Sequence, residues 1–376
     1  MKRIIGLVGC LVAFVSVFTS CDKVEAISPS GTYIEGYIEG IQGGELILVQ
    51  SLMANSIVTI DTIIPDAEGG FTIGPNVPEI GFYRIFLNNN NFVNLILEPN
   101  DTLLFSANVE DLEGTYAIEG NEETQKLKEL NDMLNAYVDK IDSINNLVGI
   151  AKSNQYYNEV AFLMSGQEEL QMSTGENIRT FVKENSTYLA SLSAVQKLDP
   201  DGDFELFVKV KDDLTPKIGG TPLHTNFSSQ IAVWANAQMG ATMLDIKLKN
   251  PEGESITLYD QLADVTLVDF WASWCRPCRG ENPNIVKAFE KYKSKGFTVV
   301  GISLDEDAEL WKRAIKQDGL AWTHMSDLKL WSSAAVAQYN IGSVPASFLV
   351  DKDGKILAKN LRGAALDLKL TQLLGE

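Results

Sequence analysis

The sequence predicts a protein of three folded parts: an antiparallel β sandwich or barrel, a helical middle region and a C-terminal α/β domain. Three observations predict this. Residues 31–120 hold short β-branched and aromatic runs between turn clusters, residues 121–238 have apolar residues at helical spacing, and residues 239–376 alternate strand and helix patterns. A chain of 376 residues also exceeds the usual size of one domain.

The composition is that of an ordinary globular protein, with 45% hydrophobic and 22% charged residues. The formal net charge is −19, and the sequence contains no basic patch. Binding to nucleic acid depends on Lys and Arg contacts to phosphate, so the charge argues against a nucleic-acid partner. The acidity is expected to serve solubility.

Residues 1–20 are predicted to be a secretory signal, because Lys2 and Arg3 precede an apolar stretch. The segment FTSC, which ends at Cys21, resembles a relaxed lipobox. Cys21 would then be the lipidated first residue, residues 21–30 a lipid-anchored linker, and the protein would face the periplasm from the inner or outer membrane. An uncleaved anchor or an ordinary cleaved signal is the alternative. Disulfides form in the compartment that such an exported protein reaches.

Residues 31–120 contain the strand-like runs YIEGYI, ELILV and FYRIFL, separated by Gly-rich and Asn-rich turn clusters. Short strands at this spacing predict a small antiparallel sandwich or barrel. The region carries no catalytic constellation. It is predicted to be a spacer or docking surface rather than a ligand-binding enzyme module.

The helical region, residues 121–238, contains an apolar seam with alternating spacings of three and four residues over about three heptads. The seam residues are Leu127, Leu130, Leu134, Tyr137, Ile141, Ile144 and Val148. Such a seam can form a homodimer contact through residues 127–148. It can equally pack against later helices of the same chain, such as the one that carries Phe227, Ile231 and Trp234.

The strongest chemical signal is the run WCRPC, in which two residues separate Cys275 from Cys278. The apolar segment 265–271 before it is typical of a buried strand, and the segment after it has helical spacing. Cys275 is therefore expected at a helix N-terminus, where free N–H groups and the helix dipole lower a thiol pKa below its free value of about 8.5. Such a pair can alternate between disulfide and dithiol.

Half of a zinc site and an inert structural disulfide are the two other interpretations of this pair. A tetrahedral zinc site needs two further ligands. The other cysteines and histidines are Cys10, Cys21, His224 and His324, and both of those cysteines lie in the N-terminal segment. We therefore expect no metal and no cofactor beyond the redox-active cysteine pair itself.

The residues around the pair carry a family resemblance. VDFWASWCRPC resembles the active site of thioredoxin, and the following RGENP resembles the TlpA/ResA branch of membrane-anchored thiol-disulfide oxidoreductases. Further along, GSVPASFLVDKDGKI resembles the cis-proline loop and its hairpin. The resemblance covers about residues 240–376 and implies a thioredoxin fold with a β-α-β-α-β-β-α plan. The residue pattern predicts an amphipathic helix over 306–318 and another helix over 328–340. Upstream, EGGFTI and LEPNDT resemble the N-terminal β domain of Bacteroidetes-type lipoproteins that carry thioredoxin modules.

This resemblance implies roles for the residues of the pair. Cys275 is the exposed nucleophile that attacks a substrate disulfide, and Cys278, more buried, resolves the mixed disulfide. Pro345, if cis, places the Val344 backbone beside the sulfur atoms, where a substrate strand can pair with it. Arg276 adds a positive charge that favours the thiolate. The expected substrate-binding residues are Trp274, Arg276, Pro277, Val344 and Pro345.

Two carboxylates, Asp269 and Glu281, are predicted to handle protons. Asp269 aligns with the buried aspartate of thioredoxin, and Glu281 aligns with the TlpA/ResA glutamate. Burial raises a carboxyl pKa, which suits a general base near neutral pH. The chain departs from the family by carrying both acids and by having Gly301 in place of the lysine that partners the aspartate in thioredoxin. Alternatively, Glu281 caps the first helical turn and Asp269 has a structural role.

Several aromatic residues are predicted to be structural. His324 has Trp322 and Met325 as near neighbours in the sequence, which is typical of a packed core histidine. Trp331 is predicted to lie in the core. Trp271 is expected to join Trp274 in the wall of the active site.

The predicted function is that of an exported thiol-disulfide oxidoreductase. The resemblance favours a reductase of protein disulfides, fed by a membrane thiol donor of the DsbD/CcdA type, and implies a part in cell redox homeostasis and cytochrome c maturation. A thiol peroxidase of the AhpC/TSA type is one alternative, although Ala272 stands where a peroxidatic site has Thr or Ser. A ligand- or protein-binding lipoprotein with an accessory redox module is the other.

Overall fold

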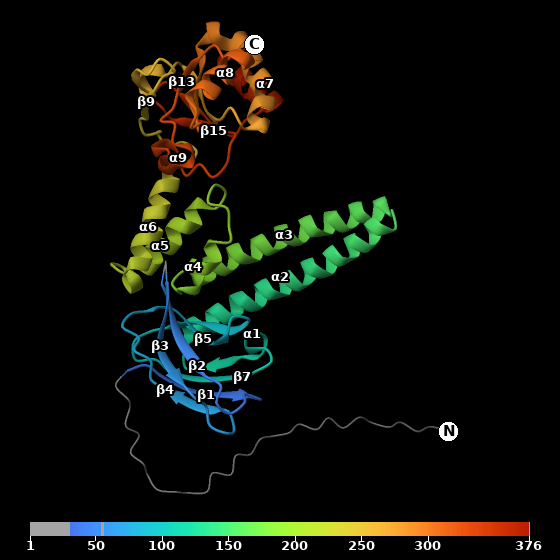
Figure 1. Cartoon of the computed structure of the whole chain (residues 1–376), viewed down its shortest axis with the longest axis vertical. Helices are drawn as coiled ribbons and strands as arrows, with labels where there is room; N and C mark the ends of the chain where they lie inside the picture. Colours follow the sequence, from blue (N-terminus) through green and yellow to red (C-terminus); the bar gives the residue numbers. More distant parts are fainter. Residues whose placement is uncertain (1–30, 54–55, 376) are drawn as a thin grey trace.

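The computed structural model describes residues 31–53 and 56–375. The predicted signal segment 1–20, the lipidated Cys21 and the linker 21–30 lie outside the described residues and stay predictions. The three parts of the chain follow one another along the long axis of the molecule, with the β domain and the α/β domain at opposite ends (Figure 1). This order of the parts was predicted and is confirmed. Every helix within the described ranges is too short or too polar to cross a bilayer.

The β domain consists of two four-stranded sheets, with strand orders β4-β1-β7-β8 and β3-β2-β5-β6. Apolar residues of both sheets form one shared core, as expected for a sandwich. One feature differs from the prediction: β1 and β7 are parallel, which is possible because no hairpin joins them and five strands separate them along the chain. The elements are β1 (Tyr33–Glu39), β2 (Ile47–Met53), β3 (Ser56–Ile63), β4 (Gly70–Ile73), β5 (Gly81–Asn88), β6 (Asn91–Leu97), β7 (Thr102–Asn108), α1 (Leu112–Thr115) and β8 (Ala117–Glu119).

The helical region begins with two long helices that form an antiparallel hairpin, which projects from the side of the molecule (Figure 1). Three shorter helices lie between the β domain and the α/β domain. The five helices are α2 (Glu122–Ser153), α3 (Tyr157–Asn185), α4 (Ala190–Val195), α5 (Phe204–Ile218) and α6 (Pro222–Ala235).

The β domain and the helical region share a hydrophobic core. Ile80 and Ile96 of the β domain belong to the same buried cluster as residues from all five helices. At the start of α2, the Thr124 hydroxyl donates to the Ile96 carbonyl at 2.7 Å and accepts from the Ile96 N–H at 2.9 Å. The buried Glu123 carboxylate accepts from the Leu189 N–H at 2.7 Å. The Thr124 bonds fix the base of the hairpin on the sandwich, and the Glu123 bond links α2 to the start of α4.

The apolar seam of α2 is largely covered within the chain. Leu127 and Leu130 are buried in the cluster that also contains Phe227, Ile231 and Trp234, as the in-chain alternative predicted. Val148, at the far end of the seam, is also buried, and α3 is the helix that packs along α2. A homodimer contact through residues 127–148 stays a prediction.

The α/β domain has a five-stranded sheet of order β13-β12-β11-β14-β15. This sheet contains one strand more than the expected plan, the short β13, and β9 and β10 form a separate two-stranded sheet. The expected helix over 328–340 is divided into a 3-10 turn and α9. Helices α7 and α10 pack on one face of the sheet, where they share a core with β11 and β12. The elements are β9 (Lys247–Lys249), β10 (Ser255–Thr257), β11 (Val265–Trp271), α7 (Arg276–Tyr292), β12 (Phe297–Ser303), α8 (Ala308–Asp318), β13 (Thr323–Met325), α9 (Ala334–Tyr339), β14 (Ala346–Asp351), β15 (Ile356–Lys359) and α10 (Gly363–Leu374).

The core of the helical region depends on Phe207 of α5, which is fully buried and packs edge-on against Trp234 at a ring-centroid distance of 5.0 Å. Phe207→Ala is expected to lower the free energy of unfolding by about 3–5 kcal/mol, because it removes buried apolar contacts and leaves a cavity. Denaturant unfolding followed by circular dichroism measures this. Phe162→Ala is the matched control, since Phe162 is 77% exposed and its loss should change stability by about 0.5 kcal/mol or less. Equal effects of the two variants would contradict the packing described.

Candidate active site

The cysteine pair lies where strand β11 ends and helix α7 begins. All seven residues of β11 are buried, and the chain leaves the strand at Trp271 and enters the helix at Arg276. Cys275 is the N-cap of α7, and its Sγ accepts a hydrogen bond from the Cys278 N–H at 3.1 Å. The predicted position of Cys275 at a helix N-terminus is therefore confirmed. The free N–H groups and the helix dipole at this end favour a thiolate.

Cys275 and Cys278 are joined as a disulfide, with an S–S distance of 2.02 Å. Pro277 occupies the first turn of α7, where its missing N–H costs no helical hydrogen bond. The expected difference in exposure between the cysteines is wrong for this state: Cys275 is 4% exposed and Cys278 is 2% exposed. The cause is that the Cys275 sulfur is turned toward Cys278 and the helix N-terminus. The neighbours Trp274, Arg276 and Pro277 are the exposed residues of the motif.

The loop before β14 carries the expected cis peptide bond, between Val344 and Pro345. β14 pairs with β11 in antiparallel register, with Ala346 opposite Phe270, which brings this loop to the same end of the sheet as the cysteines. Pro345 and Cys278 line one small cavity. In the part of the chain that the structure describes, the Val344 backbone N–H and C=O have no hydrogen-bond partner. A free backbone edge therefore lies beside the disulfide.

Asp269 lies beneath the cysteines, with its side chain buried at 6% exposure. It lines the same small cavity as Cys278 and Glu281, with a volume of about 10 Å³. Burial raises the pKa of Asp269 from 3.8 to about 7, while the Arg362 charge lowers it and the Glu281 charge raises it. Its carboxylate accepts no hydrogen bond from the described residues. The two carboxylates that were predicted to handle protons thus line one cavity with Cys278.

Glu281 is held differently from Asp269. One of its carboxylate oxygens accepts from the Asn284 side chain at 3.0 Å, and the other accepts from the Gly363 N–H at 2.7 Å. Because Asn284 belongs to α7 and Gly363 begins α10, Glu281 joins the two helices that cover this face of the sheet. The alternative prediction was that Glu281 caps the first turn of its own helix. Its bond to the Gly363 N–H goes beyond that role.

The position opposite Asp269 on β12 is Gly301. A Cβ atom built there would lie 2.4 Å from the His324 Nδ1 atom and 3.0 Å from the Trp271 indole nitrogen, so the imidazole fills the space that a side chain at 301 would need. His324 is 3% exposed and packs between the rings of Trp271 and Trp322. Burial lowers its pKa to about 4, so it is neutral at pH 7, in line with the predicted core position.

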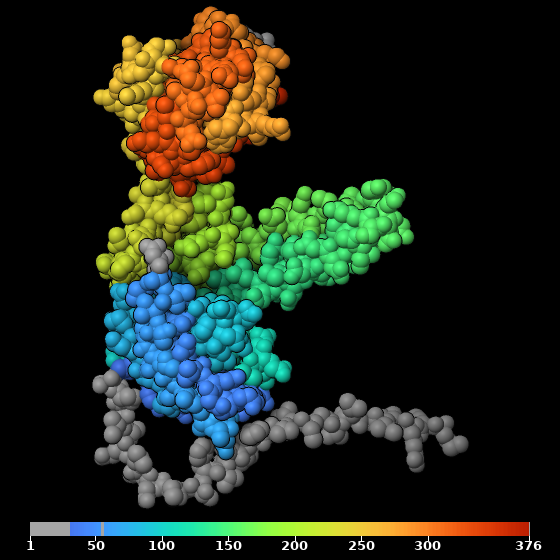
Figure 2. Space-filling view, in the orientation of Figure 1, coloured from blue at the N-terminus to red at the C-terminus, as the bar shows by residue number. Residues whose placement is uncertain are grey.

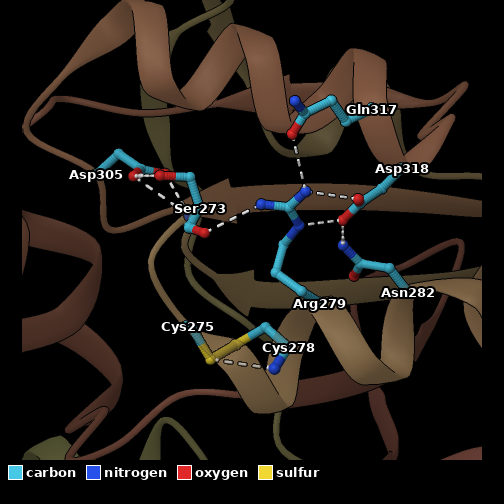
Figure 3. Close-up of polar contacts among 8 residues, drawn as sticks. All are labelled: Ser273, Cys275, Cys278, Arg279, Asn282, Asp305, Gln317 and Asp318. Atoms are coloured by element: carbon cyan, nitrogen blue, oxygen red, sulfur yellow. Dashed lines mark hydrogen bonds and ion pairs between the residues drawn. A yellow bond between two sulfur atoms is a disulfide. The ribbon is translucent and has the colours of Figure 1, made fainter.

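A network of polar side chains fixes the loop that connects β11 to α7 (Figure 3). Arg279, one residue after the second cysteine, donates to both oxygens of Asp318 at the end of α8 and to the Ser273 carbonyl at 3.2 Å. Asn282 donates to the same Asp318 carboxylate at 2.6 Å. On the other side, the buried Asp305 accepts from the Ser273 hydroxyl and N–H. The paired charges hold the cysteine loop against α8 and the end of β12.

Arg362 is a residue of this site that the sequence did not single out. It lies between β15 and α10, and its guanidinium donates to the Pro345 carbonyl at 2.5 Å. Its charge also acts on Asp269. The signal in the sequence was a basic residue between the last strand and the last helix. Such a residue lies at the edge of the sheet where the chain enters α10.

Trp331 was predicted to lie in the core, and this is wrong. It is 45% exposed, and its ring lies 6.4 Å from the ring of Trp274, which is 49% exposed. The chain beside it contains two non-glycine residues in left-handed conformation, Leu328 and Leu330, and these turn the segment out of the expected helix. An exposed pair of indole rings therefore flanks the disulfide.

In the ranges 31–53 and 56–375, no group of three His, Cys, Asp or Glu side chains is arranged to hold a metal ion. The chemically distinctive feature of this site is a disulfide at a helix N-terminus. It lies beside a free backbone edge and above a buried carboxyl group whose pKa is close to neutral. Such an arrangement can exchange thiols and disulfides and can take up and release the accompanying protons.

Two comparisons with known protein sequences agree with this geometry. Residues 239–359 match the AhpC/TSA family. The protein named thiol-disulfide oxidoreductase ResA of Bacillus anthracis is 32% identical over 120 residues, which cover 32% of this chain and 68% of the relative. A ResA of Geobacillus kaustophilus is 26% identical over 137 residues, which cover 36% of this chain and 75% of the relative.

Solved structures with sequence similarity include a thiol-disulfide oxidoreductase from Bacteroides fragilis NCTC 9343, 38% identical, with 35% of this chain and 99% of that chain covered at a TM-score of 0.34. Another is the thioredoxin domain of a thiol-disulfide oxidoreductase from Bacteroides vulgatus, 35% identical, with 36% and 97% covered at a TM-score of 0.35. Given the extent of the match to ResA and the thioredoxin-like α/β domain, the chain belongs to the ResA-type thiol-disulfide oxidoreductases.

Proposed function

We propose that this protein is an exported, lipid-anchored reductase of protein disulfides, in which Cys275 attacks and Cys278 resolves. The observation that carries the proposal is the position of the pair: Cys275 caps the N-terminus of α7 with Cys278 in disulfide contact. Export and anchoring are supported by the signal-like residues 1–20 and by Cys21 at the end of the FTSC segment. The protein would act at the periplasmic side of a membrane.

The reaction begins with the reduced pair. The Cys275 thiolate attacks one sulfur of a substrate disulfide, forms a mixed disulfide and expels a substrate thiolate, which takes a proton. Cys278 then gives up its proton and attacks the Cys275 sulfur, which releases the second substrate thiolate and forms the Cys275–Cys278 disulfide. Two electrons pass from the protein to the substrate. A membrane thiol donor of the DsbD/CcdA type is proposed to return the pair to the dithiol, so no other cofactor is required.

Asp269 is the proposed acceptor of the Cys278 proton. It shares the small cavity with Cys278 and has a pKa of about 7, so it can hold or release a proton at physiological pH. Glu281 contributes through its charge, which raises the pKa of Asp269, and by holding the N-terminus of α10 in place. We therefore assign proton transfer to Asp269 and a supporting role to Glu281.

The substrate is proposed to bind across the exposed rim of the site. The free Val344 backbone beside Pro345 can add a substrate strand by main-chain hydrogen bonds. The exposed Trp274 contributes apolar surface on the other side of the sulfur atoms, together with Trp331. Arg276 and Pro277, both exposed at the start of α7, complete this surface.

The roles of the two cysteines predict different outcomes for their variants. Cys275→Ser should abolish the reduction of insulin disulfides, because the attacking sulfur is lost. Cys278→Ser should accumulate a mixed disulfide with the substrate, visible as a mass shift that dithiothreitol removes. Residual insulin reduction by Cys275→Ser would contradict the assignment. Peroxide consumption that is fast and requires only Cys275 would instead support the thiol peroxidase suggested by the AhpC/TSA match.

The direction of electron flow is tested by the reduction potential of the pair. Equilibration of the protein lacking residues 1–21 with dithiothreitol or glutathione buffers is expected to give a value near that of thioredoxin, about −270 mV. Such a pair can be kept reduced by a membrane donor and can reduce substrates. A value near that of DsbA, about −120 mV, would overturn the reductase assignment in favour of an oxidant or isomerase.

The raised pKa of Asp269 predicts a pH-dependent stability and rate. Between about pH 4 and pH 7 the folded protein keeps a proton that the unfolded chain releases, so stability falls as pH rises through this range. Asp269→Asn should therefore be more stable than wild type above pH 7, by on the order of 4 kcal/mol, and equally stable near pH 4. Denaturant unfolding at both pH values measures this.

In activity, Asp269→Asn should lose an inflection near pH 7 in the rate of disulfide reduction. Glu281→Gln is the matched control and should keep an inflection, moved to lower pH because one negative charge is removed. If the inflection persists in Asp269→Asn and disappears in Glu281→Gln, proton transfer belongs to Glu281.

A further inference from the structure

A second, larger cavity lies between the α/β domain and the helical region. Its volume is about 530 Å³. Figure 2 shows the α/β domain resting directly on the helical region. The helical region contributes the turn 199–201 and Trp234, and the α/β domain contributes the loop before β14 and the end of β15. Two parts of the chain that are far apart in sequence therefore form its walls.

This cavity adjoins the active site. Pro345 and Arg362 line both the interdomain cavity and the small cavity that contains Cys278, and the Arg362 guanidinium is bonded to the Pro345 carbonyl. The residues Gly342 and Ser343, just before the free Val344 backbone, line the interdomain cavity as well. A polypeptide that pairs with Val344 and continues past Pro345 would therefore enter the space between the domains.

Polar contacts link the wall from the helical region to the α/β domain. The Lys359 ammonium of β15 forms an ion pair with Asp201 at 2.6 Å. Behind the turn, the Gln238 side chain donates to the Pro200 carbonyl at 3.4 Å, and the Asn236 side chain donates to the Gln338 carbonyl of α9 at 3.3 Å. The turn 199–201 thus has a defined position relative to the cis-proline loop.

Four charged side chains line the cavity, Asp199, Asp201, Lys359 and Arg362, and Arg362 is bonded to the Pro345 carbonyl. Asp199 and Asp201 are both exposed. Lys359 neutralises Asp201, but the Asp199 carboxylate accepts only the Asp201 N–H, at 3.1 Å, and among residues 31–53 and 56–375 it has no cationic partner. An uncompensated carboxylate at the edge of a cavity favours a positively charged group.

We propose that the interdomain cavity is a substrate subsite that takes the polypeptide flanking the reactive cysteine of the substrate, with a Lys or Arg side chain directed at Asp199. This inference rests on the proposed disulfide exchange at Cys275 and names the class of substrate that the same site selects. The helical region is then a specificity-determining part of the enzyme, because the α/β domain alone forms only one wall of the cavity.

The test uses the full chain in its reduced form and symmetric disulfides of short peptides. The peptides differ only in one residue within three positions of the cysteine, which is either Lys or Glu. Separate peptides place this residue on the N-terminal and on the C-terminal side of the cysteine. Each reduction consumes the protein dithiol and gives two peptide thiols and the Cys275–Cys278 disulfide. Acid quench and chromatography of the free peptide give the second-order rate constant. Hydroxyethyl disulfide, which is uncharged and has no peptide chain, reports exchange at the sulfur atoms alone.

When the varied residue is on one of the two flanks, wild-type protein is expected to reduce the Lys peptide about two- to fivefold faster than the Glu peptide, which is the effect of one exposed ion pair. This preference should decline at high salt, because salt screens the charges. Asp199→Asn should abolish the preference, while its side-chain oxygen can still accept the Asp201 N–H. Asp142→Asn is the matched control, because Asp142 is an exposed acid on the projecting hairpin and makes the same change in net charge. It should keep the preference.

Equal rates for the two peptides in wild type, or a preference that survives in Asp199→Asn, would overturn the subsite. If the protein then still reduces hydroxyethyl disulfide, the proposed exchange chemistry stands and only the subsite fails. If the wild-type protein reduces neither the peptides nor hydroxyethyl disulfide, the proposed function fails and the subsite fails with it.

Discussion

The active site depends on the antiparallel pairing of strand β11 with strand β14. This pairing sets Ala346 opposite Phe270, so the cis-proline loop and the cysteine loop leave the sheet at the same end. It also fixes which residues of β11 point toward α7. A slip of one residue would turn Asp269 to the other face of the sheet and remove it from Cys278. The complete burial of β11 makes such a slip costly, because the apolar residues would change faces as well.

The two carboxylates near the disulfide are distinguished by their hydrogen bonds. Glu281 uses both oxygens to bind donors from α7 and α10. Asp269 is buried without a donor among the described residues, and burial is the main cause of its raised pKa. The same chemical group can therefore hold helices together at one position and exchange protons at another, a few side chains apart.

Much of this site could be predicted because its information is local in the sequence. The Cys275 N-cap and the cis bond at Pro345 follow from short motifs whose strand and helix neighbours are evident. Arg362 and Asp199 were missed because their importance arises only when distant segments meet at the cis-proline loop. Trp331 was misplaced because a large aromatic residue is usually buried. The parallel pairing of the first and seventh strands was missed for a related reason, since strand order depends on the whole sandwich.

The core that the β domain shares with the helical region has a mechanical consequence. Ile80 and Ile96 are buried among the helices, so these two parts form a single rigid base. The α/β domain meets this base through polar links such as those of Lys359 with Asp201 and Asn236 with Gln338. Among the described residues, the contact between the α/β domain and this base is therefore the place where a rigid-body movement would break the fewest buried contacts. Any such movement would change the width of the interdomain cavity that adjoins the cysteine pair. The relative orientation of the two parts would therefore set the size of the polypeptide that can bind there.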